Sequence, residues 1–130
     1  MKLALPLSLI LAHYVGDWIF QTNWQALNKS KNNQALSLHV LSYSACFLPW
    51  GLGFASATFI LHWVTDYVTS RATSNLFFFR PTECYTVKGT PYKHWLYIGA
   101  LRGKFFKMIG ADQLIHYVCL ALTYRIFFGG

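Results

Sequence analysis

The residues best suited to chemistry are three histidine–aspartate pairs, in each of which the two residues are four positions apart. The pairs are His13 and Asp17, His62 and Asp66, and, in reversed order, Asp112 and His116. On a helix, residues four apart lie on one face, so both side chains of a pair can reach one partner. Every aspartate of the chain belongs to such a pair. The pairs therefore form one constellation, although each pair alone is a weak signal.

Histidine nitrogens and aspartate oxygens are good ligands for zinc, manganese or iron, and helical bundles build metal sites from inward-facing side chains. A further histidine, His39, lies early in the apolar run 35–50. We therefore predict a divalent-metal site, with zinc as the first choice and manganese or iron as alternatives. The predicted ligands are His13, Asp17, His39, His62, Asp66, Asp112 and His116. One metal with supporting partners and two metals are both compatible with this number of ligands.

Other polar residues beside the predicted ligands could orient them or contact a substrate. They are Gln21, Lys29, Tyr43, Arg71 and Gln113. Lys29 and Arg71 are placed where they could meet an anionic headgroup, although the positive-inside rule is the simpler explanation for both. Ordinary polar packing explains the two glutamines equally well, and a core or interface position is the simpler explanation for Tyr43.

The composition is typical of an integral membrane protein. Of 130 residues, 55% are hydrophobic, 18% are aromatic and only 12% are charged, and this length fits one domain, residues 1–130. The net charge is +7, but the basic residues lie between apolar runs, and the sequence has no basic recognition helix or base-stacking module. Membrane lipid is therefore an expected partner and nucleic acid is not; a homo-oligomer or a larger membrane assembly stays open.

Four apolar runs predict helices over residues 3–21, 35–50, 54–68 and 111–128. Residues 94–109 mix apolar and basic side chains, which favours an amphipathic helix on the membrane surface. The first run lacks a small-x-small cleavage site, so we expect it to be retained rather than removed as a signal peptide. The predicted fold is all-α, an integral membrane bundle of four transmembrane helices with an interfacial amphipathic helix before the last span.

Basic residues also predict the orientation of this bundle. Most of them lie in the connectors after the first and third runs, so these connectors should face the cytoplasm of a bacterial inner membrane, with both termini outside. The fourth helix then runs opposite to the first and third. The reversed order of Asp112 and His116 keeps these residues at the same depths as the other aspartates and histidines. His39 falls near the same depth, so all four helices should contribute to one site.

The ordered set of polar residues resembles a family of small bacterial and phage membrane proteins classified only as a domain of unknown function. The matching residues are His13-x-x-Gly16-Asp17 with Gln21, Asn28-Lys29, His39 with Tyr43, His62-x-x-x-Asp66-Tyr67, and Asp112-Gln113-x-x-His116. The resemblance covers nearly the whole chain and implies a membrane bundle, but no established reaction. More distantly, the first two pairs are similar to those of the family called membrane-bound metal-dependent hydrolases.

We therefore predict metal-dependent hydrolysis of an amphipathic, anionic substrate, such as a lipid or isoprenoid phosphate, at the cytoplasmic face. The metal would lower the pKa of a water molecule, and Asp17, Asp66 or Asp112 would accept its proton. Two alternatives are non-enzymatic. The pairs could hold the bundle together by hydrogen bonds between helices, as in a structural partner of a larger or phage-related assembly. They could also form a path for protons or ions.

Overall fold

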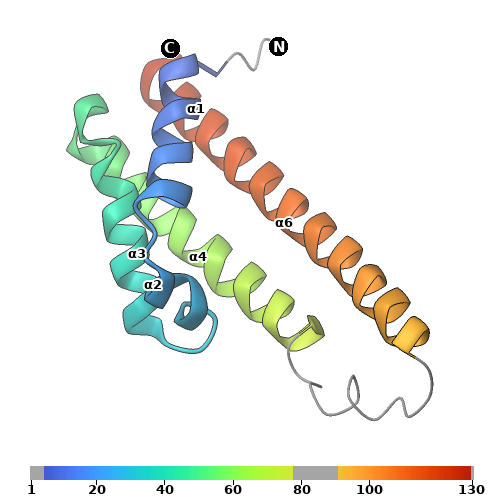
Figure 1. Ribbon diagram of the computed structural model, residues 1–130. Helices are drawn as coiled ribbons and strands as arrows, with labels where there is room; N and C mark the ends of the chain where they lie inside the picture. Colours follow the sequence, from blue (N-terminus) through green and yellow to red (C-terminus); the bar gives the residue numbers. More distant parts are fainter. Residues whose placement is uncertain (1–4, 78–90, 130) are drawn as a thin grey trace.

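The computed structural model describes residues 5–77 and 91–129, and all regular structure in these ranges is helical (Figure 1). This confirms the all-α prediction. The elements in chain order are α1 (Leu7–Tyr14), the π-helical turn η1 (Val15–Ile19), α2 (Asn23–Asn28), α3 (Asn33–Ala45), the 3-10 turn η2 (Leu48–Trp50), α4 (Leu52–Phe77) and α6 (Pro91–Phe128).

Helices α4 and α6 are the long antiparallel pair of the fold (Figure 1). Helix α4 packs against α6 and against α3, while η1 and α2 both pack against α3. The beginning of α1 and the end of α6 lie at one end of the bundle, and α2 lies toward the other end (Figure 1). The short segment that contains Asp17 is thereby held beside the long helices.

The connector after the first run contains a helix, α2, where the sequence predicted only a polar connector. Its start is a capping box: the backbone N–H of Gln25 donates to Thr22 Oγ1, and the backbone N–H of Thr22 donates to Gln25 Oε1. These bonds satisfy two backbone donors that a helix start otherwise leaves free. Lys29 follows directly as the C-terminal cap residue of α2, so the capping box also determines where this lysine lies.

The two long helices extend further than predicted. Helix α4 continues to Phe77, and α6 runs without a break from Pro91 through Gly110, so the expected surface helix and the last span are one helix. Proline suits the first position of a helix, and an interior glycine costs only about 1 kcal/mol. The predicted amphipathic face falls largely on residues 91–106, whose side chains lie outside the described part of the structure.

Within residues 5–77 and 91–129, no helix combines the length with the apolar character needed to cross a membrane.

The buried interior changes from apolar to polar along the bundle. At one end, a core cluster joins α1, α3, α4 and α6 through Leu9, Tyr43, Phe47, Phe54, Ala55 and Leu120. Each inward stripe then continues at steps of four residues into polar side chains, a spacing that keeps them on one helix face. The stripes are Leu9–His13–Asp17, Phe47–Tyr43–His39, Phe54–Thr58–His62–Asp66 and Leu120–His116–Asp112. The apolar end packs the helices, and the polar end gathers the residues with chemistry.

The turn η1 lies unusually close to α3 at Gly16. A Cβ atom on Gly16 would lie 3.0 Å from Cδ2 and 3.1 Å from Cα of Tyr43. The wider π turn and the missing side chain together let Asp17 approach α3. Single π turns of this kind occur frequently at functional sites.

We predict that Gly16→Ala destabilises the protein by about 1–3 kcal/mol, the usual cost of overpacking, because the α3 backbone at Tyr43 must move. The matched control is Gly110→Ala, since a Cβ there has no atom within 4 Å. This control should be neutral or should stabilise α6 by up to about 1 kcal/mol. Thermal unfolding of the purified variants measures both effects, and equal effects would contradict the close packing at Gly16.

Candidate metal centre

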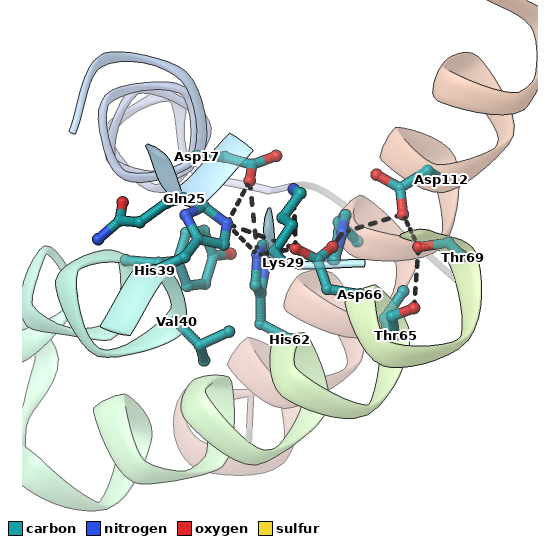
Figure 2. Close-up of polar contacts among 12 residues, drawn as sticks. Asp17, Gln25, Lys29, His39, Val40, His62, Thr65, Asp66, Thr69 and Asp112 are labelled. Atoms are coloured by element: carbon teal, nitrogen blue, oxygen red, sulfur yellow. Dashed lines mark hydrogen bonds and ion pairs between the residues drawn. The ribbon is translucent and has the colours of Figure 1, made fainter. Parts of the chain in front are cut away.

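Four buried side chains converge in the polar half of the bundle (Figure 2). Asp17 comes from η1, His39 from α3, and His62 and Asp66 from successive turns of α4. Their side chains are at most 6% exposed. Each offers one ligand atom, and these atoms all lie within 4.8 Å of one another. We call these residues the four-atom group.

Five of the six distances between the ligand atoms of the four-atom group are close to those along the edges of a tetrahedral zinc site, and the sixth, between the two aspartate oxygens, is within 4.8 Å. His39 Nε2 lies 3.2 Å from Asp17 Oδ1 and 3.4 Å from Asp66 Oδ2. His62 Nε2 lies 3.4 Å and 3.5 Å from the same two oxygens, and the two Nε2 atoms are 3.3 Å apart. In tetrahedral zinc sites, bonds of about 2.0–2.2 Å separate neighbouring ligand atoms by about 3.3–3.6 Å. The group could therefore hold a metal ion.

Protons and a cation are alternative ways to satisfy these four atoms. The Nε2 atoms of His39 and His62 face each other as well as the same two carboxylate oxygens, and only one proton can lie between two nitrogens. The Nδ1 atoms of both rings are buried and have no hydrogen-bond partner among the described residues. All polar contacts of both rings are therefore made by Nε2 and converge on one point. A cation between the four atoms would satisfy all of them together.

His13, although a predicted ligand, lies beside the four-atom group rather than in it. Its Nδ1 lies 2.9 Å from the Tyr43 hydroxyl and its Nε2 lies 2.9 Å from Gln113 Oε1. Both ring nitrogens therefore already have hydrogen-bond partners. Nε2 lies 3.8 Å from Asp17 Oδ2. His13 therefore holds the residues around the site rather than presenting a free nitrogen to it.

Gln113 connects the aspartates of two elements. Its Nε2 donates to Asp17 Oδ2 at 2.8 Å and to Asp112 Oδ2 at 3.3 Å. Because the amide occupies the second oxygen of each carboxylate, Oδ1 of Asp17 is left facing His39 and His62. Partners of this kind orient metal ligands and contribute to metal affinity.

Lys29 reaches from the end of α2 into the same cluster (Figure 2). Its Nζ lies 3.0 Å from Asp66 Oδ2, and its side chain is 19% exposed. Burial alone would lower the pKa of the Lys29 ammonium, but the carboxylates of Asp66 and Asp17 outweigh this effect and raise the pKa above its ordinary value. Lys29 is therefore a permanent positive charge at the edge of the four-atom group.

Asp66 also belongs to a second group of potential ligands, together with Asp112 and His116. His116 Nε2 lies 3.0 Å from Asp66 Oδ1 and 3.3 Å from Asp112 Oδ1. The hydroxyl of Thr69 contacts the same Asp112 oxygen. Thr69 was not predicted from the sequence, although its position one turn after Asp66 on the same helix was a usable signal.

Two residues with predicted substrate or supporting roles make no hydrogen bond to the four-atom group. The Arg71 guanidinium lies over the Tyr67 ring, 3.7 Å from its centroid, and also donates to Asn33 Oδ1. Gln21 Oε1 is buried without a hydrogen-bond partner among the described residues. The structure therefore brings Lys29, Tyr43 and Gln113 to the cluster, and places Arg71 and Gln21 outside its hydrogen-bond network.

We predict that Tyr43→Phe destabilises the protein by about 1–3 kcal/mol, because it leaves the buried His13 Nδ1 without its hydrogen-bond donor. The aromatic stacking on His62, with ring centroids 3.8 Å apart, is retained in this variant. Tyr67→Phe removes the same atom from an exposed ring and should change stability by less than about 0.5 kcal/mol. Thermal unfolding of both variants checks the difference, and the absence of any difference would argue against a hydrogen bond at His13.

The chain was compared with protein-family models, with curated proteins and with solved structures, and none of them matches. The geometry of the site is therefore the basis on which function is assigned.

Proposed function

We propose that the chain is a metal-dependent hydrolase of the bacterial inner membrane. The observation that carries this proposal is the convergence of four ligand atoms from η1, α3 and α4 at the spacing of a tetrahedral metal site. Zinc is the first choice, because its preferred ligands and distances match this set, and manganese or iron are alternatives. A bound divalent ion would supply a water molecule with a lowered pKa.

The protein's own residues would then handle the proton and the substrate. Asp112 is the most accessible of the three aspartates in the cluster, since its side chain is 18% exposed against 6% for Asp17 and 1% for Asp66. It is therefore the aspartate best placed to accept a proton from water. Lys29 supplies a positive charge beside the cluster, where it would attract a negatively charged substrate group.

The proposed location rests on the distribution of apolar and polar side chains. Large apolar residues are exposed along the outer faces of the helices, among them Leu11, Leu41, Ile60, Val64, Leu114, Val118 and Leu122. The buried side chains of the polar half include four histidines and two aspartates instead. Large exposed apolar surfaces are rare on soluble proteins, whereas a protein in lipid keeps its ionisable groups inside. We propose a four-span bundle with residues 94–109 at the interface, both termini outside and basic connectors in the cytoplasm.

These two features together define the substrate class. The outer faces of the bundle would be in contact with acyl chains, while the cluster and Lys29 favour an anion. The proposed substrate is an amphipathic phosphate, such as a lipid or isoprenoid phosphate, presented from the cytoplasmic side.

A non-enzymatic role is the second candidate, and one observation favours it. The four-atom group would fill a tetrahedral metal shell with protein ligands alone, which is typical of structural zinc sites rather than catalytic ones. In that role a metal would hold η1, α3 and α4 together in a structural membrane protein. Without a metal, the same residues would serve interhelical hydrogen bonding or proton conduction.

We predict that detergent-purified protein, reloaded with zinc and washed, retains at least one equivalent of metal by elemental mass spectrometry. His39→Ala and His62→Ala should each lower zinc affinity strongly, because each removes one of the four ligands. His94→Ala is the control, since this histidine has no aspartate four residues away. A metal-free, well-folded wild type would contradict the proposal.

The hydrolytic part has its own measurement, phosphate release from dioleoyl phosphatidic acid or farnesyl phosphate by the reloaded protein. Release that requires both zinc and His62 would support the hydrolase. Retained zinc without release from either substrate would favour the structural role.

We predict that the protein remains in the membrane fraction after an alkaline carbonate wash. An alkaline phosphatase fusion after Gly130 should be active, because the proposed C-terminus lies outside, whereas a fusion after Lys31 should be inactive. Green fluorescent protein fused at the same two positions provides the control, since it should fluoresce only after Lys31. Extraction of the protein by carbonate would contradict membrane insertion, and an inactive C-terminal phosphatase fusion would contradict the orientation.

A further inference from the structure

We propose that Asp66 bridges two metal ions, and that the second ion binds Asp66 Oδ1, Asp112 Oδ1 and His116 Nε2. This inference rests on the proposed function, because it assigns a second ion next to the four-atom group. It also assigns different roles to the two positions: the four-atom group is the closed site, and the Asp112–His116 group is the open site where substrate binds. In this two-ion arrangement Asp112 is a ligand of the second ion instead of the acceptor of a proton from water.

The two carboxylate oxygens of Asp66 face different groups of potential ligands. Oδ2 faces Nε2 of His39 and His62 at 3.4 Å and 3.5 Å and also accepts from Lys29 Nζ at 3.0 Å. Oδ1 faces His116 Nε2 at 3.0 Å. A carboxylate that turns one oxygen to each of two ligand groups is suited to bridge two ions. Two-metal hydrolytic sites hold their ions about 3.5–4 Å apart, and helical bundles build such sites from inward carboxylates and histidines.

Gln113 orients one aspartate in each of the two groups. The Gln113 amide donates to Oδ2 of Asp17, in the four-atom group, and to Oδ2 of Asp112, in the second group. Each of these carboxylates therefore turns Oδ1 toward its own group, and Asp112 Oδ1 also accepts from the Thr69 hydroxyl. A single side chain thus holds the outer aspartates in matching orientations on either side of Asp66 (Figure 2 shows the three aspartates).

The two groups differ in their number of protein ligand atoms and in the exposure of their side chains. The four-atom group has four protein ligand atoms, but the second group has three. Catalytic zinc sites commonly have three protein ligands and leave a position open, whereas structural sites have four. The open position also lies beside the accessible carboxylate, since the Asp112 side chain is 18% exposed. A substrate oxygen would therefore reach the second ion before the first.

The charges of the cluster indicate what would bind there. Asp17, Asp66 and Asp112 contribute three negative charges and Lys29 contributes one positive charge, so the cluster carries a net charge of about −2 when the imidazoles are neutral. One divalent ion cancels this charge, and two ions leave about +2. A phosphate monoester dianion would restore neutrality. The inference thus narrows the substrate class to amphipathic phosphate monoesters.

The experiment measures metal stoichiometry in the full-length, detergent-purified protein. Wild-type protein reloaded with zinc should hold two equivalents, while Asp112→Asn and His116→Ala should each hold one and remain folded by circular dichroism. His94→Ala should hold two. Reloading with manganese provides a second readout, because adjacent Mn²⁺ ions give an exchange-coupled electron paramagnetic resonance spectrum. Asp112→Asn should convert this spectrum to that of an isolated ion.

The outcomes distinguish this inference from the proposed function. One equivalent in wild type that Asp112→Asn leaves unchanged would overturn the second site and leave the metal-dependent function standing. Two equivalents that persist in both Asp112→Asn and His116→Ala would show that the second ion binds elsewhere, which also overturns the inference. If His116→Ala fails to fold, Asp112→Asn decides alone, since it keeps the size of the side chain. No metal in folded wild type would overturn both proposals.

Discussion

The constraint on which the structure depends is the charge of Asp66 in the middle of the bundle. Its side chain is 1% exposed, and an uncompensated buried carboxylate costs several kcal/mol. Its compensation comes from three other parts of the chain: Lys29 after α2, His39 on α3 and His116 on α6. Satisfying this one carboxylate therefore fixes the positions of three elements around α4. A shift of any of these elements would leave a charge without its partner.

Packing in the apolar half of the bundle positions the helices that carry this polar arrangement. Leu9, Phe47, Phe54 and Leu120 pack at one end, and each lies on the same helix stripe as a polar ligand one or more turns away. Packing at the apolar end thus determines how each helix is rotated, and the rotation aims the polar residues inward. The reversed order of Asp112 and His116 follows from the same geometry, because α6 runs antiparallel to α4 (Figure 1).

Much of this could be predicted from residue spacing, because spacing of four on a helix is a local property. It identified the helical class, and every residue in the two candidate groups was among the predicted ligands. Residue spacing could not show how each helix is rotated about its own axis within the bundle. His13 has the same spacing to an aspartate as His62, yet its nitrogens bond Tyr43 and Gln113, the latter 100 positions away. Helix α2 was missed for another reason: its Thr22–Gln25 capping box is a local signal that was present in the sequence.

The negative charge of the cluster can be balanced in two ways, by protonated imidazoles or by a metal ion. Protonated imidazoles would balance it with hydrogen bonds alone, and each histidine would then need a donor hydrogen directed at a separate acceptor. Instead, the Nε2 atoms of His39 and His62 lie 3.3 Å apart and face the same pair of carboxylate oxygens. Two N–H donors there would have two carboxylate oxygens to accept them, although their hydrogens would crowd each other; as lone-pair ligands, the same two nitrogens could bind one cation. The four-atom group could therefore hold a metal ion, which would balance the charge of the cluster without protonated imidazoles.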